Sequence, residues 1–286
     1  MKELVIISGK GGTGKTSIVG SFAALAEDAI LADCDVDASD LHLLLQPVIK
    51  DRHDFLGMKK ALIAQALCTQ CGICESNCRF DAIQGFRVDP FSCEGCGVCY
   101  HLCPQQAIQM VDNVCGQWFS AVTPYGPLIY ARLGIGEENS GKLVAEVKKQ
   151  TKELAQSLSK ELIIIDGPPG IGCPVIATIA GVDLVLVITE PTVAGLHDLV
   201  RVLQLANHFQ VPAAVCINKW DLDEEKSEEI EAYCREQKVE VIGRIPFDRR
   251  MTEAIIQGIP PVKYGSGGAM EAIQRVWQKV QNHLQA

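Results

Sequence analysis

The sequence of 286 residues predicts an α/β fold, in which a doubly wound, mostly parallel sheet carries a small inserted α+β domain. Short apolar runs alternate along the chain with segments of helical length and composition. A glycine-rich loop follows the first run, and a cysteine-rich stretch at 60–110 then interrupts the alternation. Continuous apolar runs suit strands that are buried on both faces, and their alternation with helices favours a parallel sheet.

Six apolar runs are the expected strands of this sheet. They lie at 4–7, 29–32, 162–165, 184–188, 213–217 and 239–242. The expected helices lie at 17–27, 142–159, 197–209 and 224–236. Residues 117–130 alternate aromatic and β-branched residues with turn formers, which predicts antiparallel strands. In such a sheet the functional loops lie at the carboxyl ends of the strands.

The cysteine-rich stretch 60–110 is the predicted insertion, and it separates a first part of the larger domain, 1–59, from a second part, 111–286. Near the end of the chain, residues 270–286 predict a helix with one apolar face. That face carries Ile273, Trp277, Val280 and Leu284. We expect this helix to pack on the core; a helix that targets a membrane is the alternative.

Composition narrows the class of protein. A net charge of -9 argues against a general nucleic-acid binder, because phosphate backbones demand a basic surface. No apolar run reaches the ~18 residues that a bilayer span needs, and the N-terminus does not have the pattern of a signal peptide. Eight of the 13 cysteines lie between Cys68 and Cys103, which favours metal ligands over disulfides. We therefore expect a cytoplasmic protein without stable membrane anchoring.

The glycine-rich loop fits the pattern G-x4-G-K-[ST]. It reads Gly9-Lys10-Gly11-Gly12-Thr13-Gly14-Lys15-Thr16, after an expected strand and before an expected helix. In such a loop the backbone N–H groups and the helix N-terminus converge on phosphate oxygens. We expect Lys15 to reach the β- and γ-phosphates and the Thr16 hydroxyl to ligate Mg²⁺.

The second lysine of this loop, Lys10, makes the pattern more specific. The sequence Gly-Lys-Gly-Gly-x-Gly-Lys-Thr resembles the deviant phosphate loop of the MinD/ParA/Mrp and nitrogenase iron protein group (SIMIBI class) of dimeric P-loop ATPases. The resemblance implies that Lys10 crosses the dimer interface to the partner's nucleotide. There it would supply positive charge where the transition state spreads negative charge.

Two acidic segments complete the resemblance. Asp166, at the start of Asp-Gly-Pro-Pro-Gly, resembles switch II, which implies a carboxylate that holds Mg²⁺ through water and glycines, Gly167 and Gly170, that let the loop move. Asp35 resembles the switch I aspartate that orients the attacking water. Asp33 and Asp37 are alternatives for that role, and Asp37 or Ser39 is a candidate helix cap.

A third segment, Asn218-Lys219-Trp220-Asp221, matches the guanine-reading motif Asn-Lys-x-Asp, although the overall resemblance favours ATP over GTP. Pro246 and Phe247 follow the next strand and are candidates for the base pocket. The expected catalytic residues are Lys10, Lys15, Asp35 and Asp166. The residues expected to contact nucleotide are Gly9, Lys10, Gly11, Gly12, Thr13, Gly14, Lys15, Thr16, Ser17, Gly170, Asn218, Lys219, Asp221, Pro246 and Phe247.

The insertion contains the run C-x2-C-x2-C-x3-C twice, which is the signature of bacterial two-cluster ferredoxins. In that signature the fourth cysteine of each run ligates the other cluster. We therefore predict one [4Fe-4S] cluster on Cys68, Cys71, Cys74 and Cys103, and a second on Cys93, Cys96, Cys99 and Cys78. Two zinc sites are the competing interpretation. Cys173 lies after switch II as a cluster cysteine does in the nitrogenase iron protein, so it is a weaker candidate metal ligand.

Together these motifs look like a MinD-superfamily ATPase with an inserted ferredoxin-like domain. The resemblance implies ATP hydrolysis by a homodimer that forms on nucleotide binding. Its switching would be coupled to electron transfer, or to assembly of a metallocofactor or iron–sulfur cluster on a partner protein. A scaffold or carrier for clusters is one alternative, and a MinD-like positioning ATPase with a redox sensor is another. The expected cofactors are two [4Fe-4S] clusters, Mg²⁺ and ATP.

Overall fold

The computed structural model describes residues 1–134, 136–137 and 140–285. The chain divides into two compact units. The first, which we call the sheet unit, comprises Met1–Arg52, Trp118–Arg132 and Ser140–Ala286. The second, which we call the cysteine unit, comprises His53–Gln117 and Leu133–Asn139. The cysteine unit extends beyond the insertion predicted at 60–110 on both sides, since the chain that flanks its paired strands also belongs to it.

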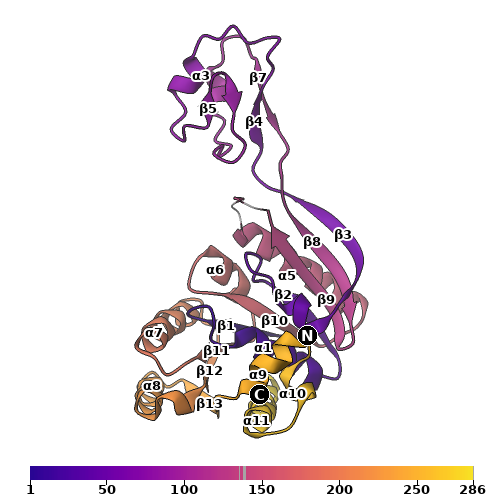
Figure 1. Ribbon diagram of the computed structural model, residues 1–286, viewed down its shortest axis with the longest axis vertical. Helices are drawn as coiled ribbons and strands as arrows, with labels where there is room; N and C mark the ends of the chain where they lie inside the picture. Colours follow the sequence, from indigo (N-terminus) through magenta and orange to yellow (C-terminus); the bar gives the residue numbers. More distant parts are fainter. Residues whose placement is uncertain (135, 138–139, 286) are drawn as a thin grey trace. The chain divides into compact units, whose positions relative to one another are not determined.

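Within the described residues the main sheet has nine strands (Figure 1). In sheet order they are β13 (Glu240–Ile245), β12 (Ala213–Asn218), β11 (Leu184–Thr189), β1 (Lys2–Ser8), β10 (Leu162–Pro169), β2 (Ala29–Asp33), β9 (Gly126–Leu133), β8 (Val114–Thr123) and β3 (Val48–Leu56). Every neighbouring pair from β13 to β9 is parallel. The predicted α/β class with a mostly parallel sheet is thus confirmed, and all six predicted strands are present.

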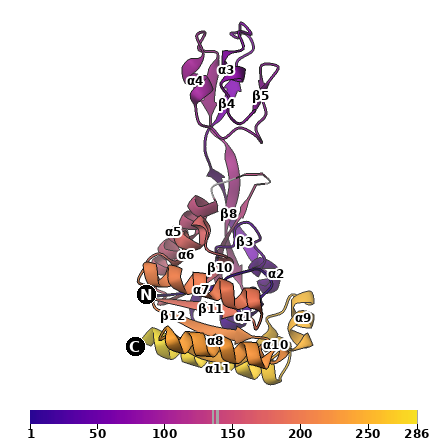
Figure 2. The ribbon, with the colours of Figure 1, turned by 90° about the vertical axis from the view of Figure 1, so that its left-hand side faces the viewer.

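Helices cover both faces of the sheet (Figure 2). Of the described helices, four pack against one face of the sheet. They are α5 (Ser140–Ser157), α6 (Cys173–Ile179), α7 (Val193–His208) and α8 (Glu224–Glu236). The opposite layer contains α1 (Lys15–Leu25), α2 (Leu41–Leu45), α9 (Arg249–Ile256), α10 (Pro261–Tyr264) and α11 (Gly268–Gln285). Successive strand side chains point to opposite faces, so Leu4 and Ile6 pack toward α1 while Val5 and Ile7 face the other layer.

The last helix, α11, packs on the core as predicted. Ile273, Trp277, Val280 and Leu284 are all buried, and the Trp277 ring lies 4.9 Å from the Phe22 ring of α1. The predicted end at residue 286 lies outside the described residues. Among the described residues, no helix combines the length and the apolar character that a bilayer crossing requires.

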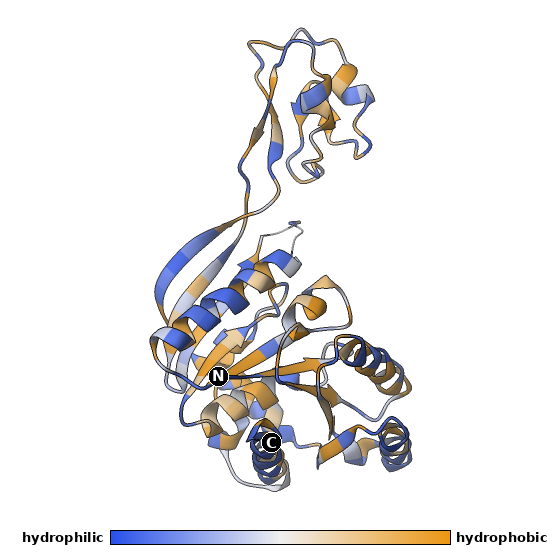
Figure 3. Ribbon diagram, turned by 180° about the vertical axis from the view of Figure 1, so that it is seen from behind, coloured by the Kyte–Doolittle hydropathy of each residue, from blue (hydrophilic) through white to orange (hydrophobic). Residues whose placement is uncertain are grey.

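One strand of the main sheet was not predicted. β3 lies at the edge of the sheet and is exposed along most of its length, with five consecutive polar residues at 50–54. Figure 3 shows this strand as mainly hydrophilic, in contrast to the hydrophobic central strands. An apolar-run criterion finds strands that are buried on both faces and therefore misses an exposed edge strand.

The cysteine unit consists of short elements arranged as an internal repeat. They are β4 (Lys60–Ile63), α3 (Ile73–Ser76), β5 (Ile83–Gln84), β6 (Arg87–Val88), α4 (Val98–Leu102) and β7 (Ile108–Val111). The pairs β4–β7 and β5–β6 are antiparallel. The helices α3 and α4 occupy the same place in the two halves: each follows a left-handed glycine, Gly72 or Gly97, and contains the third cysteine of its run, Cys74 or Cys99.

Candidate functional site

The glycine-rich loop joins the end of β1 to the start of α1. Gly12 and Gly14 have φ angles of 80° and 87°, in the left-handed region that favours glycine. A Cβ atom on Gly14 would lie 2.4 Å from Asn218 Nδ2, so this position also needs glycine for space. The helix begins at Lys15, two residues before its predicted start, which places Thr16 and Ser17 in its first turn.

Lys15 is buried among acidic side chains at the carboxyl ends of β2 and β10. Its Nζ donates to Asp166 Oδ1 and lies 3.8 Å from Asp35 Oδ2. Burial opposes the lysine charge, but Asp166, Asp35 and Asp33 together raise the pKa of Lys15 above its usual value. The lysine is therefore charged and is held by two of the predicted acidic residues.

Asp33 is fully buried and engaged by its own chain. It accepts hydrogen bonds from the Asp35 amide at 3.0 Å, the Ser39 hydroxyl at 2.8 Å and the Leu41 amide at 3.1 Å. Because Leu41 is the first residue of α2, Asp33 caps that helix, in place of the predicted cap by Asp37 or Ser39. Burial, reinforced by Asp166, raises the pKa of Asp33 to about 8.

The Asp35 carboxylate is less buried than that of Asp33 and lies near Lys15 Nζ. Its side chain is partly exposed, and burial raises its pKa to about 6, an effect that Lys15 opposes. Asp37, the other alternative, is exposed. Of the three aspartates, Asp35 therefore combines proximity to Lys15 with access to a bound molecule.

The segment after Asp166 differs from its predicted form. β10 continues to Pro169, beyond the strand predicted at 162–165. Its register against β1 shifts between Ile6 and Ser8, opposite Gly167, where an added Cβ would lie 2.6 Å from Ile7 Cγ2. Gly170 has a φ of 90°, and its amide donates to the Ser8 carbonyl at 2.9 Å. The turn is thus hydrogen-bonded to the last residue of β1, directly before the phosphate loop.

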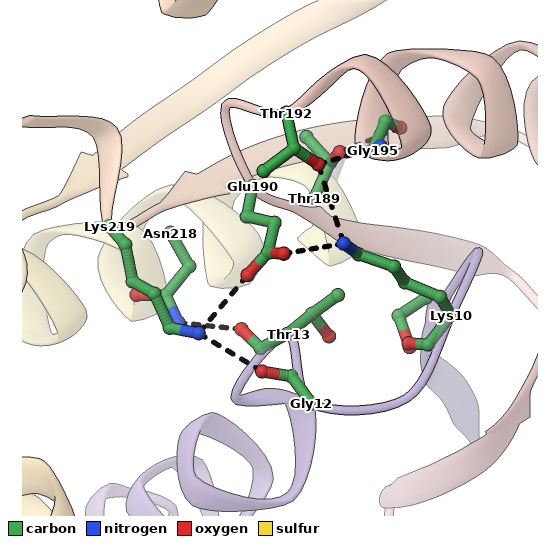
Figure 4. A network of polar contacts seen from close by, with 10 residues as sticks. Lys10, Gly12, Thr13, Thr189, Glu190, Thr192, Gly195, Asn218 and Lys219 are labelled. Carbon is green, nitrogen blue, oxygen red and sulfur yellow. Dashed lines mark hydrogen bonds and ion pairs between the residues drawn. The ribbon is translucent and has the colours of Figure 1, made fainter. Parts of the chain in front are cut away.

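The Asn-Lys-x-Asp segment braces the phosphate loop from the end of β12, two strands away from β1 (Figure 4). Asn218 Nδ2 donates to the Thr13 carbonyl at 2.6 Å, and Lys219 Nζ donates to the Gly12 carbonyl at 3.0 Å. Asp221 Oδ1 accepts the Phe247 amide at 2.6 Å. One oxygen of Asp221 is therefore occupied by the loop that carries Pro246 and Phe247, while the Phe247 side chain is about half exposed.

Lys10 lies folded against its own chain. Its Nζ is 2.6 Å from Glu190 Oε1 and 3.4 Å from Thr192 Oγ1 (Figure 4). Glu190 and Thr192 were not among the predicted site residues. Both follow β11 at the edge of the sheet where functional loops were expected, and a systematic inspection of strand ends would have found them.

The phosphate loop has the properties of an anion site. Within the part of the chain that the structure describes, Thr13 Oγ1 is buried and has no hydrogen-bond partner. A buried hydroxyl without a partner is costly, so a ligand oxygen at this position would satisfy it. Together with the left-handed glycines and the buried cation of Lys15, this hydroxyl fits a bound phosphate group.

The eight cysteines of the insertion line two separate cavities. The first contains Cys68, Cys71, Cys74 and Cys103. The second contains Cys78, Cys93, Cys96 and Cys99. Each cavity therefore takes three cysteines from one run and the fourth from the other. The remaining lining is largely apolar, with Ile63 and Ile108 in the first cavity and Ala61 and Ile83 in the second.

The backbone around these cavities also suits thiolate ligands. Gly72, Gly95 and Gly97 adopt left-handed conformations, and the Ala107 amide donates to Cys103 Sγ at 3.3 Å. Burial raises the pKa of the Cys74 and Cys99 thiols. Among the described residues, no three His, Cys, Asp or Glu side chains form a site for a single metal ion. Four soft sulfur ligands around each cavity fit an iron–sulfur cluster.

Cys173 is the first residue of α6 and is exposed, and Gly141 packs against its Cβ. The remaining cysteines of the sheet unit, Cys34, Cys216 and Cys234, are buried. Cys173 is therefore the accessible thiol of the sheet unit.

Comparisons with known proteins agree with this geometry. The family model of the CobQ/CobB/MinD/ParA nucleotide binding domain matches residues 4–262. An uncharacterized protein of Methanocaldococcus jannaschii is 38% identical over 221 residues, which are 76% of this chain and 78% of that protein. An iron-sulfur cluster carrier protein of Pyrococcus abyssi is 30% identical over 158 residues, about half of each chain (50% and 53%).

A solved structure extends the likeness to the fold. The septum site-determining protein MinD of Pyrococcus horikoshii, complexed with Mg-ADP, superposes with a TM-score of 0.61 and 18% identity. The superposition covers 98% of this chain and 95% of that one. At this identity the likeness shows that the two proteins share a fold.

Proposed function

The chain belongs to the CobQ/CobB/MinD/ParA family of nucleotide-binding proteins, and we propose that it is an ATP-hydrolysing iron–sulfur protein that acts as a dimer. ATP-driven switching would be coupled to electron transfer, or to assembly of a metallocofactor or iron–sulfur cluster on a partner protein. The observation that carries the proposal is the presence, in one chain, of a phosphate loop with a buried lysine and two four-cysteine cavities.

In this proposal Asp166 and Asp35 have distinct roles at the nucleotide site. Lys15 would exchange part of its contact with Asp166 for the β- and γ-phosphates, while Asp166 and Thr16 would hold Mg²⁺. Asp35 would orient the attacking water, because it lies near Lys15 and remains partly exposed. Catalysis of phosphoryl transfer rests on such positioning and on charge stabilisation, to which Lys10 of the partner subunit would contribute.

Adenine is the favoured base. A guanine-reading aspartate offers both carboxylate oxygens to the base, but Asp221 Oδ1 already accepts the Phe247 amide. Asn218 and Lys219 are likewise bound to carbonyl groups of the phosphate loop. This bracing role accounts for the Asn-Lys-x-Asp motif without guanine. Pro246 and Phe247 would then border the base.

The cysteine unit supports a two-cluster, ferredoxin-like role. Each cavity would hold one [4Fe-4S] cluster on its four cysteine sulfurs. Burial raises the pKa of the Cys74 and Cys99 thiols, so iron would have to displace their protons on binding. When bound, such clusters supply one-electron chemistry. The chain's own contribution is an apolar lining and hydrogen bonds such as that from Ala107 to Cys103, which are features that set cluster potentials.

A carrier of iron–sulfur clusters is the second candidate function. It is favoured by the relatives named as carriers, although the match spans about half of their length. The exposed Cys173 would then bind a cluster in transit. Transfer of iron and sulfide to an apo-ferredoxin, abolished by Cys173→Ala, would favour this function over electron transfer.

Anaerobic purification tests the main proposal. We expect about eight iron and eight acid-labile sulfide atoms per chain, Mg²⁺-dependent ATP hydrolysis, and dimers in a non-hydrolysable ATP analogue by sedimentation. Iron-free protein of native fold, or protein that binds no purine triphosphate, would refute it. A cluster potential and a partner affinity that are both unchanged by the ATP analogue would refute the coupling.

A further inference from the structure

A single carboxylate, that of Glu190, holds two lysines at once. Lys10 Nζ lies 2.6 Å from Oε1, and Lys219 Nζ lies 3.1 Å from Oε2 (Figure 4). Lys10 comes from the phosphate loop, and Lys219 comes from the segment that braces the same loop. The Glu190 side chain is 15% exposed, whereas those of the lysines are 32% and 28% exposed. The carboxylate is thus the least accessible member of the group.

The backbone that carries Glu190 is fixed. The Thr192 amide donates to the Glu190 carbonyl at 2.8 Å, and the Gly195 amide donates to Thr192 Oγ1 at 2.9 Å, which caps α7. A Cβ atom on Gly195 would lie 2.2 Å from the Glu190 carbonyl oxygen, so the turn is tight. The turn therefore fixes the backbone of Glu190, and Lys219 continues to hold its carboxylate when Lys10 moves away.

Release of Lys10 would leave no unpaired buried charge. Burial opposes ionisation of Glu190, but the hydrogen bonds from Lys10 and Lys219 lower its pKa, so the carboxylate is charged. A partly buried carboxylate that lost its only partner would incur a large desolvation penalty. Here Lys219 remains bound after Lys10 departs. The arrangement therefore limits the cost of releasing Lys10 to the loss of one ion pair per protomer.

We propose that Glu190 is a positioning residue that retains Lys10 within its own protomer and releases it to the nucleotide of a second copy of this chain. The inference rests on the proposed function, in which Lys10 acts across a dimer interface. Glu190 opposes dimer closure because each protomer must break one Lys10–Glu190 ion pair. It thereby limits ATP hydrolysis in the monomer and sets the concentration at which the dimer forms.

The Glu190→Gln variant tests the retention of Lys10. The amide keeps the size of the side chain but removes the charge that holds the lysine. We expect Lys10 of the nucleotide-free monomer to be acetylated several-fold faster by a limiting amount of acetic anhydride, measured by mass spectrometry. Glu231→Gln is the matched control, because Glu231 forms a similarly exposed ion pair with Arg244, outside the phosphate loop. It should leave the acetylation rate of Lys10 unchanged.

The same variant tests the effect on assembly. A partly exposed ion pair contributes up to about 1 kcal/mol, or about fivefold. Because two pairs break per dimer, we expect the dimer dissociation constant in Mg²⁺ and a non-hydrolysable ATP analogue to fall by roughly tenfold, and by no more than about 25-fold. ADP affinity of the monomer should change by less than about twofold, since it involves no partner.

Each contrary result has a distinct meaning. An unchanged acetylation rate of Lys10 overturns the proposal, because Glu190 then does not hold the lysine in solution. Faster acetylation of Lys10 together with an unchanged dimer dissociation constant would show that Glu190 does not oppose dimer closure. If ADP affinity of the monomer rises by the same factor as dimer affinity, the effect is a general electrostatic one, and the proposal is also overturned. If the wild-type chain forms no dimer under any nucleotide, the proposed function itself fails, and with it the role of Glu190.

Discussion

Lys15 and Asp166 form a buried ion pair that joins the first residue of α1 to β10. Their side chains are 7% and 1% exposed. Lys15 also lies near Asp35, so a single lysine balances the carboxylates at the ends of two neighbouring strands. The phosphate site therefore holds its principal cation in place before any nucleotide arrives.

Lys15→Met should destabilise the chain as well as abolish ATP hydrolysis. The substitution leaves Asp166 buried without its cation, and removal of one partner of a buried pair costs about 3–5 kcal/mol. Chemical denaturation under anaerobic conditions measures this free energy of unfolding. Lys149→Met removes a lysine from an exposed pair with Glu153 and should change stability by less than about 0.5 kcal/mol. Equal effects of the two variants would contradict the structural role of Lys15.

The raised pKa of Asp33 predicts that the free energy of unfolding depends on pH. Its pKa is raised in the folded chain to about 8 from 3.8, so the folded chain binds a proton that the unfolded chain has released. This contribution is fully present below pH 3.8 and is lost as pH rises to about 8. Asp33→Asn removes the titration, so the variant should gain stability relative to wild type between pH 5 and pH 8.

The measurement for Asp33 is the difference in unfolding midpoint between variant and wild type at each pH. The absolute offset reflects altered hydrogen bonds to Ser39 and Leu41 and does not matter. Asp37→Asn, an exposed substitution in the same loop, provides the control and should give a difference that is nearly constant with pH. A constant difference for Asp33→Asn as well would show that Asp33 is ionised throughout this range.

The two cysteine cavities predict crossed ligation. The double variant Cys68→Ser/Cys103→Ser removes two ligands of one cavity and should retain about half of the iron. The double variant Cys78→Ser/Cys103→Ser removes one ligand from each cavity and should lose iron at both sites. Iron content and electron paramagnetic resonance of the reduced protein distinguish the two cases. Cys234→Ser, a buried cysteine elsewhere, is the control. If each run bound its own cluster, Cys68→Ser/Cys103→Ser would also remove one ligand from each site, so loss of iron at both sites in that variant would contradict crossed ligation.

Gly14→Ala and Gly11→Ala are matched substitutions in the phosphate loop that differ in what the added methyl group would contact. Gly14→Ala places a methyl group 2.4 Å from Asn218 Nδ2 in a left-handed conformation, so the loop must shift. We expect a loss of ADP affinity of at least about tenfold, since strain and a displaced brace together cost more than about 1.4 kcal/mol. A Cβ on Gly11 meets no atom within 4 Å, and Gly11→Ala should have a smaller effect. Titration calorimetry compares them, and a larger loss for Gly11→Ala would contradict the bracing by Asn218.

Local sequence patterns determined much of the fold and of the candidate sites. The apolar runs predicted six of the nine described strands of the main sheet, five of them internal, because a strand buried on both faces needs apolar residues at every position. Glycine, lysine and threonine at fixed spacing predicted the phosphate loop, and the helix after it begins within two residues of the predicted start. The spacing of the cysteines predicted which four would share each cavity, as the structure now arranges them. These signals lie within short segments whose local conformation they largely fix.

The tertiary structure alone decided the contacts between distant segments. Asn218 reaches Thr13 across 205 residues of sequence, and Lys10 reaches Glu190 from another strand end. Asp33 caps α2 from the end of β2, although closer residues were predicted as the cap. An exposed edge strand such as β3 has no apolar run that marks it. Such pairings depend on which strands become neighbours in the sheet, and that order follows from the packing of the whole chain, which no short segment encodes.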